Sequence, residues 1–135
     1  METRMDTEPG LTLLIVDDSA TMRAMVKRAA TLSGVALETI LEAANGQQAL
    51  DVLASVKVDA VFTDINMPVM TGVELLKRMA VEKQWSHILR VIISTDASDV
   101  RRQEVSDLNV RHYVQKPVRP EAVCDVLSQL VAGAR

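Results

Sequence analysis

The chain has 135 residues, of which 15 are basic and 18 acidic, so its formal net charge is −3. This length fits one domain of ordinary size and is too short for two. A chain so close to charge balance offers no broad basic surface for nucleic acid and no polybasic membrane signal. No apolar stretch approaches the roughly 18 residues that cross a bilayer. We therefore expect one domain that binds neither nucleic acid nor membrane.

The residue types also limit the kind of core and the compartment. Hydrophobic residues make up 48% of the chain but aromatic residues only 2%, so the core is expected to be aliphatic, as in layered helices and sheets. Cys124 is the only cysteine, which excludes an internal disulfide and favours a cytoplasmic address. The polar, acidic start predicts a disordered tail at 1–10, followed by one domain at 11–132 and a short tail at 133–135.

Apolar runs of strand length recur along the chain, separated by longer segments with helical period. The runs are at 13–16, 39–42, 58–63, 91–94 and 112–115. After the first run, apolar residues at i, i+3, i+4 spacing predict a helix that ends near Gly34, with one face made of Met22, Met25, Val26, Ala29 and Leu32. Pro120 opens the last predicted helix. This alternation predicts a five-stranded parallel sheet wrapped by helices.

The segment 98–109 has an unusual pattern for a helix of such a fold. Val100, Val105 and Leu108 are its only large apolar residues among many charges. We therefore expect its helix to dock weakly and to be more mobile than the others.

Four of the apolar runs end in polar residues suited to metal and phosphate chemistry. Asp17 and Asp18 follow the first run, Asp64 the third, Ser94 the fourth and Lys116 the fifth. In open α/β sheets, ligands bind outside the carboxyl ends of the strands where the strand order reverses, which for the order 2-1-3-4-5 lies between the first and third strands. Three carboxylates would meet there, and a magnesium ion would relieve their repulsion. An Asp carboxylate is also a nucleophile toward phosphorus.

Taken together, these motifs resemble one known family. The Asp17-Asp18 pair, Asp64, Ser94 and Lys116-Pro117 are arranged as in response-regulator receiver domains, and the chain is most similar to the single-domain chemotaxis type, CheY-like, from residue 11 to about 130. The resemblance implies a flavodoxin-like (βα)5 doubly wound parallel sheet with strand order 2-1-3-4-5. Because CheY is itself a standard example of that order, the order is taken from the resemblance.

The resemblance implies a role for each residue of the acidic cluster. Asp64 would receive a phosphoryl group from a phosphohistidine on a histidine kinase. Asp18 and Asp64 would bind Mg²⁺ directly, Asp17 largely through water and Asn66 through its backbone carbonyl, with Mn²⁺ as a substitute metal. Lys116 would pair with the phosphoryl group.

Neighbouring residues are implied to shape the site. Met67 and Pro68 belong to the turn that leads from Asp64 into the next helix. The bond between Lys116 and Pro117 is a candidate cis peptide.

The switch hydroxyl is either Ser94 or Thr95, because only one of two adjacent residues faces the site. The interval from Ser94 to Lys116 is 22 positions (116 − 94), close to the interval found in related receivers, which favours Ser94. Thr95 is the alternative.

Output is expected through binding rather than through an attached domain, since we expect no room for one after Val131. By resemblance, phosphorylation draws the switch hydroxyl inward, Tyr113 turns behind it, and the face formed by the fourth helix, the fifth strand and the fifth helix changes. The partner is a flagellar motor switch protein or, for a phosphorelay intermediate or phosphate sink, a phosphotransfer protein. A phosphatase is a further candidate partner, and we expect a monomer.

A phosphatase-type hydrolase on a similar α/β scaffold is the competing interpretation. Such enzymes use a second acidic residue, two positions after the nucleophilic Asp, as acid and base. Here that position is Asn66, which cannot do so. We therefore expect a signalling switch that catalyses only its own phosphorylation and dephosphorylation, and not an enzyme.

Overall fold

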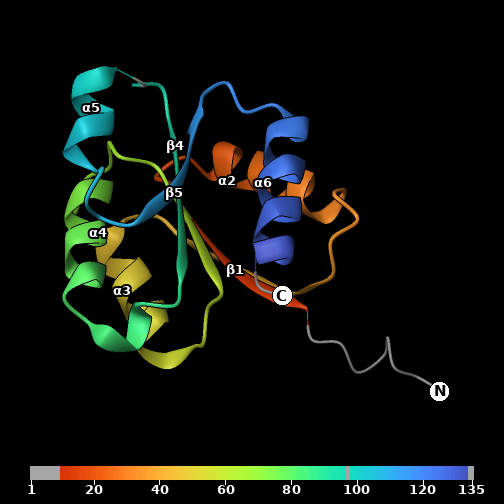
Figure 1. Cartoon of the computed structure of the whole chain (residues 1–135), viewed down its shortest axis with the longest axis horizontal. Coiled ribbons are helices and arrows are strands. Elements are labelled where there is room, and N and C mark those ends of the chain that lie inside the picture. The colour runs from red at the N-terminus through yellow and green to blue at the C-terminus, as the bar shows by residue number, and fades with distance from the viewer. Residues whose placement is uncertain (1–9, 97, 134–135) are drawn as a thin grey trace.

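Five parallel strands form one sheet in the computed structural model, which describes residues 10–96 and 98–133 (Figure 1). The strands are β1 Leu11–Val16, β2 Leu37–Ala43, β3 Ala60–Thr63, β4 Leu89–Ser94 and β5 Val110–Gln115. Their order is β2-β1-β3-β4-β5, which confirms the predicted doubly wound, flavodoxin-like fold. The predicted tails at 1–10 and 133–135 lie outside the described residues, apart from positions 10 and 133.

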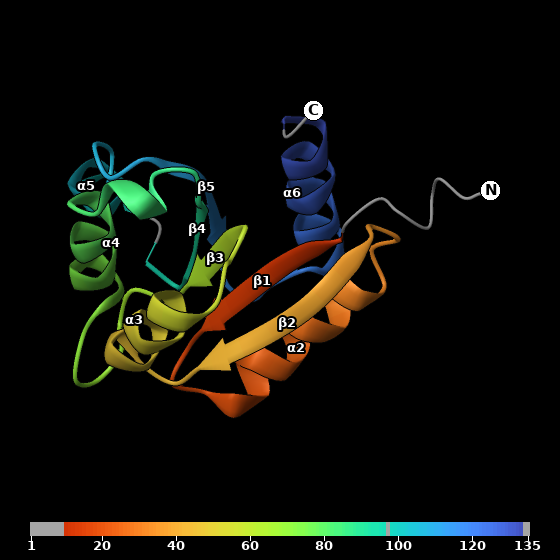
Figure 2. The ribbon, with the colours of Figure 1, turned by 90° about the horizontal axis from the view of Figure 1, so that it is seen from below.

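Helices cover both faces of the sheet. On one face lie α2 (Ala20–Thr31) and α6 (Pro120–Gly133), and on the other α3 (Gly46–Ser55), α4 (Gly72–Ala80) and α5 (Asp99–Glu104), as Figures 1 and 2 show. A short 3-10 helix, η1 (Lys83–Trp85), precedes β4. Within 10–96 and 98–133, none of the helices is long and apolar enough to cross a membrane.

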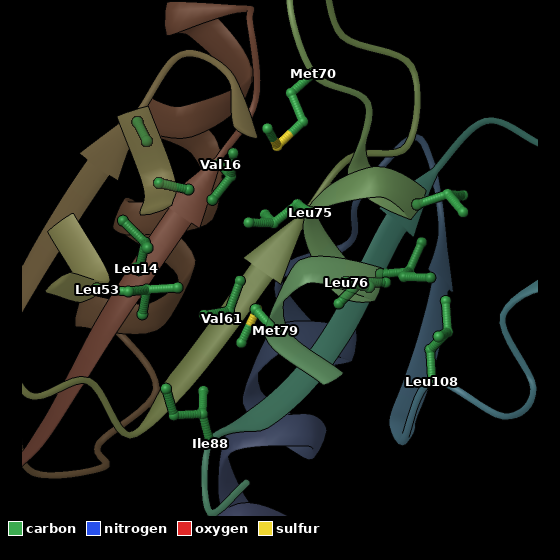
Figure 3. Packing of buried hydrophobic residues seen from close by; sticks show 14 of the residues in the cluster. Leu14, Val16, Leu53, Val61, Met70, Leu75, Leu76, Met79, Ile88 and Leu108 are labelled. Carbon is green, nitrogen blue, oxygen red and sulfur yellow. The ribbon is translucent and has the colours of Figure 1, made fainter. Parts of the chain in front are cut away.

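The central strands are buried on both faces, which explains their continuous apolar runs. In β1, Leu13 and Ile15 belong to the core beneath α2 and α6, whereas Leu14 and Val16 belong to the core beneath α3 and α4. This alternation is the two-residue period of a strand. The second core also contains Leu53, Val61, Leu75, Leu76 and Met79 (Figure 3).

Polar caps fix the starts of the helices at the carboxyl edge of the sheet. The side chains of Ser19, Asn45 and Ser98 each accept a hydrogen bond from the backbone N–H of the third residue of α2, α3 or α5. Thr71 and Glu74 form a capping box at the start of α4. These caps fix the points at which the chain enters each of the four helices.

The predicted apolar face of α2 is partly wrong. Met25 and Leu32 are 44% and 70% exposed, and the buried residues of the helix are Val26, Ala29 and Ala30. Leu32 lies beyond the last residue of the helix, and small alanines allow α2 to approach its neighbours closely. The third strand is also shorter than its apolar run, since β3 begins at 60 and the buried residue 58 precedes it.

The segment 98–109 forms only the six-residue helix α5, which is shorter than the sequence suggested. No residue of α5 is buried, and Val100 is 80% exposed. Val105 and Leu108, which follow the helix, are buried and attach the segment to the core beneath α4. The expectation of weak docking is confirmed for α5 itself.

Arg90 of β4 is a buried cation that the sequence did not reveal. Arg90 is only 3% exposed. Its guanidinium donates hydrogen bonds to the carbonyl oxygens of Trp85 at 2.8 Å and Leu108 at 3.4 Å. Burial lowers the pKa of this guanidinium. Arg90 thereby ties η1 and the segment after α5 to the central sheet.

Candidate functional site

Asp17, Asp18 and Asp64 meet at the carboxyl edge of the sheet. Asp17 and Asp18 follow β1, and Asp64 follows β3, its neighbour at the point where the strand order reverses. One carboxylate oxygen from each residue lies within 4.8 Å of the other two. Asp17 and Asp64 are 5% and 8% exposed, whereas Asp18 is exposed. The fold thus brings together the three carboxylates that the sequence places at strand ends.

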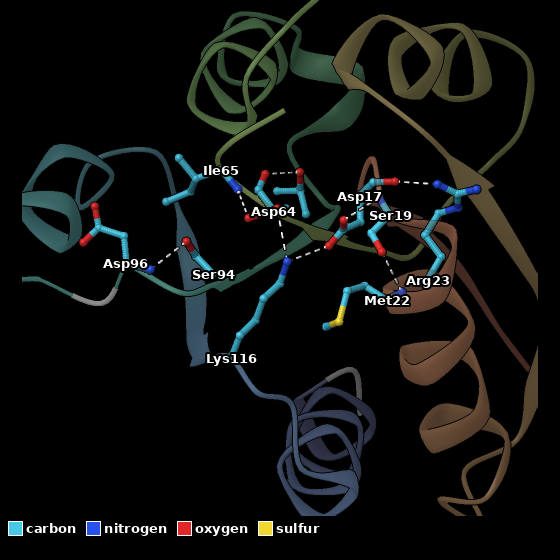
Figure 4. A network of polar contacts seen from close by, with 10 residues as sticks. Asp17, Ser19, Met22, Arg23, Asp64, Ile65, Ser94, Asp96 and Lys116 are labelled. Carbon is cyan, nitrogen blue, oxygen red and sulfur yellow. Dashed lines mark hydrogen bonds and ion pairs between the residues drawn. The ribbon is translucent and has the colours of Figure 1, made fainter. Parts of the chain in front are cut away.

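Lys116, directly after β5, supplies the counter-charge (Figure 4). Its Nζ lies 2.9 Å from Oδ2 of Asp17 and 3.1 Å from Oδ2 of Asp64. Burial by itself lowers the pKa of the Lys116 ammonium, but the hydrogen bonds and charges of the two carboxylates outweigh burial and raise that pKa above its ordinary value. One ammonium among three carboxylates leaves the cluster with a net negative charge.

Backbone groups around β3 fix the orientation of Asp64. Its N–H donates to Val16 O at 2.9 Å, and its Oδ1 accepts from Ile65 N at 2.7 Å. The hydroxyl of Thr63 donates to Asp64 O at 2.8 Å. The backbone of Asp64 is therefore held by Val16 and Thr63, and its side chain by Ile65 and Lys116.

Gly72, the first residue of α4, permits this position because it has no side chain. A Cβ added at Gly72 would lie 2.0 Å from the carbonyl oxygen of Asp64. The start of α4 and the backbone of Asp64 therefore touch directly. Sequence reasoning missed this role, since a close approach of two backbone segments leaves no periodic signal.

Arg23 fixes the turn that carries the acidic pair. Its Nη1 donates to Asp17 O at 2.6 Å, and its Nε lies 2.9 Å from Oε1 of Glu42 in β2. On the other side, Ser19 N donates to Oδ1 of Asp17 at 2.9 Å. Sequence reasoning also missed Arg23 here, although a cation one helical turn after an acidic pair is a readable signal.

Asp96 connects three elements next to the site. Ser94 at the end of β4 is fully buried, and its Oγ accepts from Asp96 N at 3.1 Å, whereas Thr95 is exposed. The hydroxyl of Tyr113 in β5 donates to the carbonyl of Asp96. The Asp96 carboxylate lies 3.3 Å from Nε of Arg101 in α5. A movement of Ser94 therefore affects the contacts of β5 and α5 as well.

Tyr113 in β5 is half-buried and lies next to α5. The guanidinium of Arg102 lies over its ring, 4.6 Å from the centroid. Burial, together with the nearby charge of Asp96, raises the pKa of the Tyr113 phenol. The phenol is therefore a hydrogen-bond donor at neutral pH.

The remaining candidate residues lie in the loops after β3 and β5. Asn66 and Pro68 are exposed, and Met67 is buried. The Lys116–Pro117 peptide bond is cis.

The acidic cluster is suited to a small divalent cation. Its carboxylates are hard oxygen ligands of the kind that Mg²⁺ prefers, and one lysine does not balance them. A cation held by Asp17, Asp18 and Asp64 would neutralise the charge of a phosphoryl group arriving at the crevice.

Comparison with known proteins places this site in a family. The family model described as the response regulator receiver domain matches residues 13–128. The chain is 36% identical over 124 residues to the chemotaxis protein CheY1 of Helicobacter pylori, covering 90% of this chain and 96% of that protein. It is 32% identical over 120 residues to a chemotaxis protein CheY homolog of Campylobacter jejuni, covering 88% of this chain and 91% of that protein.

Solved structures agree with the sequence matches. The chemotaxis response regulator CheY4 of Vibrio cholerae superposes with a TM-score of 0.78 at 30% identity, covering 90% of this chain and 98% of that chain. The match covers nearly the whole of both chains. The chain therefore belongs to the response regulator receiver domain family and is CheY-like.

Proposed function

We propose that the chain is a stand-alone receiver of a two-component system in which Asp64 accepts a phosphoryl group from a histidine kinase. The observation that carries this proposal is the pairing of a single Lys116 ammonium with both Asp17 and Asp64 in one crevice. Chemotaxis is the role named for the relatives that match nearly the whole chain, and we extend that role to this protein. The role places it in the cytoplasm.

In the proposed transfer Asp64 is the residue of this protein that forms a covalent bond, and the other site residues position the phosphoryl group and stabilise its charge. A carboxylate oxygen of Asp64 attacks the phosphorus of phosphohistidine, the P–N bond breaks, and the departing imidazole takes a proton from water. The Lys116 ammonium offsets the negative charge of the incoming phosphoryl group. Asp18 and Asp64, the backbone carbonyl of Asn66 and, largely through water, Asp17 would hold Mg²⁺, for which Mn²⁺ would substitute, and the cation would offset the charge of the phosphoryl group.

The phosphoryl group is read out on the face formed by α5, β5 and α6. It brings about two negative charges and three acceptor oxygens into the crevice. The buried Ser94, rather than the exposed Thr95, turns its hydroxyl to one of these oxygens and weakens its bond with Asp96. Tyr113 then leaves the Asp96 carbonyl and turns inward, which changes the face that a partner binds.

A protein of this kind is a switch and not an enzyme acting on other substrates. Asn66 stands where an aspartyl-phosphate hydrolase needs an acid and base. The downstream partner is a flagellar motor switch protein. A phosphotransfer protein in a phosphorelay is the alternative, and a phosphatase is a further partner.

Phosphoramidate, a small donor with a P–N bond, tests the acceptor. With Mg²⁺, wild-type protein gains one phosphoryl group, read by intact mass, and Asp64→Asn gains none. Asp51→Asn, which changes an exposed Asp of α3, is the matched control and is labelled like the wild type. Labelling of the Asp64→Asn variant would overturn the assignment.

A binding experiment separates the two downstream roles. Protein treated with beryllofluoride, a phosphoryl mimic, is expected to gain affinity for a purified motor switch protein. Gain of affinity for a purified histidine phosphotransfer protein instead would favour the phosphorelay.

A further inference from the structure

Val69, in the loop between β3 and α4, has a backbone conformation that is unfavourable for its residue type. Its φ is +71°, and Met70 N donates to Pro68 O at 2.7 Å across it. Together these are features of the rare, strained γ-turn whose central φ is about +75°. A β-branched side chain is especially unsuited to such a φ, whereas glycine or asparagine tolerates it.

Buried neighbours hold the loop in this shape. Met67 and Met70 on either side are each 7% exposed, and Met70 lies directly on Gly46 at the start of α3. Gly46 N also donates to Met70 O at 3.3 Å. The strained backbone persists because the packing of the buried residues on both sides of Val69 fixes the path of the loop, as is common beside functional sites.

The strained turn presents Val69 to solvent, where it is 80% exposed. Exposure alone means little, since single apolar residues are common on protein surfaces. Val81 and Val100 are 76% and 80% exposed as well. Val69 differs from both in its left-handed backbone and in its place five residues after Asp64.

We infer that Val69 is a contact residue for the histidine phosphodonor protein, an inference that rests on the function proposed above. A histidine side chain is short, so the donor's backbone must come close to the loops around Asp64 for its phosphoryl group to reach the carboxylate. The loop after β3 starts at Asp64, and Val69 is its most exposed apolar side chain. Contact there buries an apolar group and keeps water from the transfer.

The test compares two donors that share a P–N bond but differ in whether a protein surrounds it. The donors are phosphoramidate and a purified, phosphorylated histidine phosphotransfer domain, chosen from a panel for its ability to label the wild type. Val69→Gly and Val69→Asn are expected to slow transfer from the domain about five- to tenfold, in line with the loss of a partly buried valine contact. Labelling by phosphoramidate is unchanged, and thermal unfolding occurs at or above the wild-type temperature.

Two further variants control for other effects. Val69→Ile keeps an apolar side chain and is expected to transfer within about twofold of wild type. Val81→Ser removes an equally exposed valine beyond the end of α4 and leaves both donors unaffected.

Several outcomes would overturn the inference. Unchanged transfer from the domain to Val69→Gly and Val69→Asn would show that the donor does not contact Val69, and equal slowing with both donors would show that Val69 acts through the acceptor site. Labelling of the wild type by phosphoramidate but by no domain of the panel would also contradict it. Failure of phosphoramidate to label Asp64 would instead contradict the proposed function.

Discussion

The contact between Gly72 and the carbonyl of Asp64 makes the position of Asp64 sensitive to the addition of a single methyl group at Gly72. A Cβ at Gly72 would lie 2.0 Å from the Asp64 carbonyl oxygen, whereas a Cβ at Gly46 would lie 2.7 Å from the nearest side-chain atom of Met70, which is a milder overlap. The two glycines both begin helices at the same edge of the sheet. They therefore form a matched pair for separating a severe overlap with backbone from a milder overlap with a side chain.

We predict that Gly72→Ala lowers the free energy of unfolding by about 1–3 kcal/mol, the usual effect of overpacking, and slows phosphorylation by phosphoramidate. Gly46→Ala is expected to have the smaller effect on stability and little effect on phosphorylation. Urea unfolding and intact mass measure the two quantities. Equal losses in both variants would contradict the argument from the Asp64 carbonyl.

The ion pairs of Lys116 predict how stability depends on alkaline pH. The folded pKa of Lys116 is raised above its ordinary value of 10.5, so the pairs contribute stability that is fully present below this value. The contribution is lost as the pH rises through the folded pKa. The difference in unfolding free energy between wild type and Lys116→Met is therefore expected to stay constant from about pH 8 to pH 10 and to shrink above it. A difference in unfolding free energy that also stays constant above about pH 10 would contradict the pairing.

At the scale of elements, the apolar runs and polar strand ends predict the alternation of strands and helices and the meeting of the three carboxylates. Periodicity was less reliable where packing decides: Ala30 of α2 is buried while Met25 is exposed, because helix packing favours the smaller side chain. The buried Arg90 and the strained Val69 depend on contacts between distant segments. No local pattern contains that information.

The short helix α5 is predicted to be the least protected helix of the described chain. It has six residues and buries none of them, whereas α6 buries a stripe that includes Val123 and Leu127. Hydrogen exchange is expected to be faster for amides of α5 than for those of α6. Tyr113→Phe, which removes the hydroxyl bound to Asp96, is expected to speed exchange in α5 further while leaving phosphorylation of Asp64 unchanged. Exchange in α5 as slow as in α6 would contradict weak docking.

At the scale of the whole molecule, a cation held by the acidic cluster would couple metal binding to folding. The cluster joins the ends of β1 and β3 in the middle of the sheet, and its carboxylates come together only when the chain is folded. A cation that binds the folded state stabilises it by mass action.

Mg²⁺ at about ten times its dissociation constant is therefore predicted to raise the free energy of unfolding by about 1.4 kcal/mol. A chelator reverses the effect, and Mn²⁺ reproduces it. Asp18→Asn, which changes the exposed ligand without disturbing Lys116, abolishes most of the stabilisation, and Asp51→Asn retains it. Equal stabilisation of both variants would place the cation elsewhere.

Asp96 links the end of β4, β5 and α5 through one residue. Its backbone N–H, carbonyl and carboxylate bind three different elements, through Ser94, Tyr113 and Arg101. A displacement of Ser94 that carries Asp96 with it shifts the contacts with Tyr113 and Arg101 as well, because one residue makes all three. For the function proposed above, this linkage disfavours half-switched surfaces, so the strength of a signal would be set by how many molecules have switched and not by how far each one has moved.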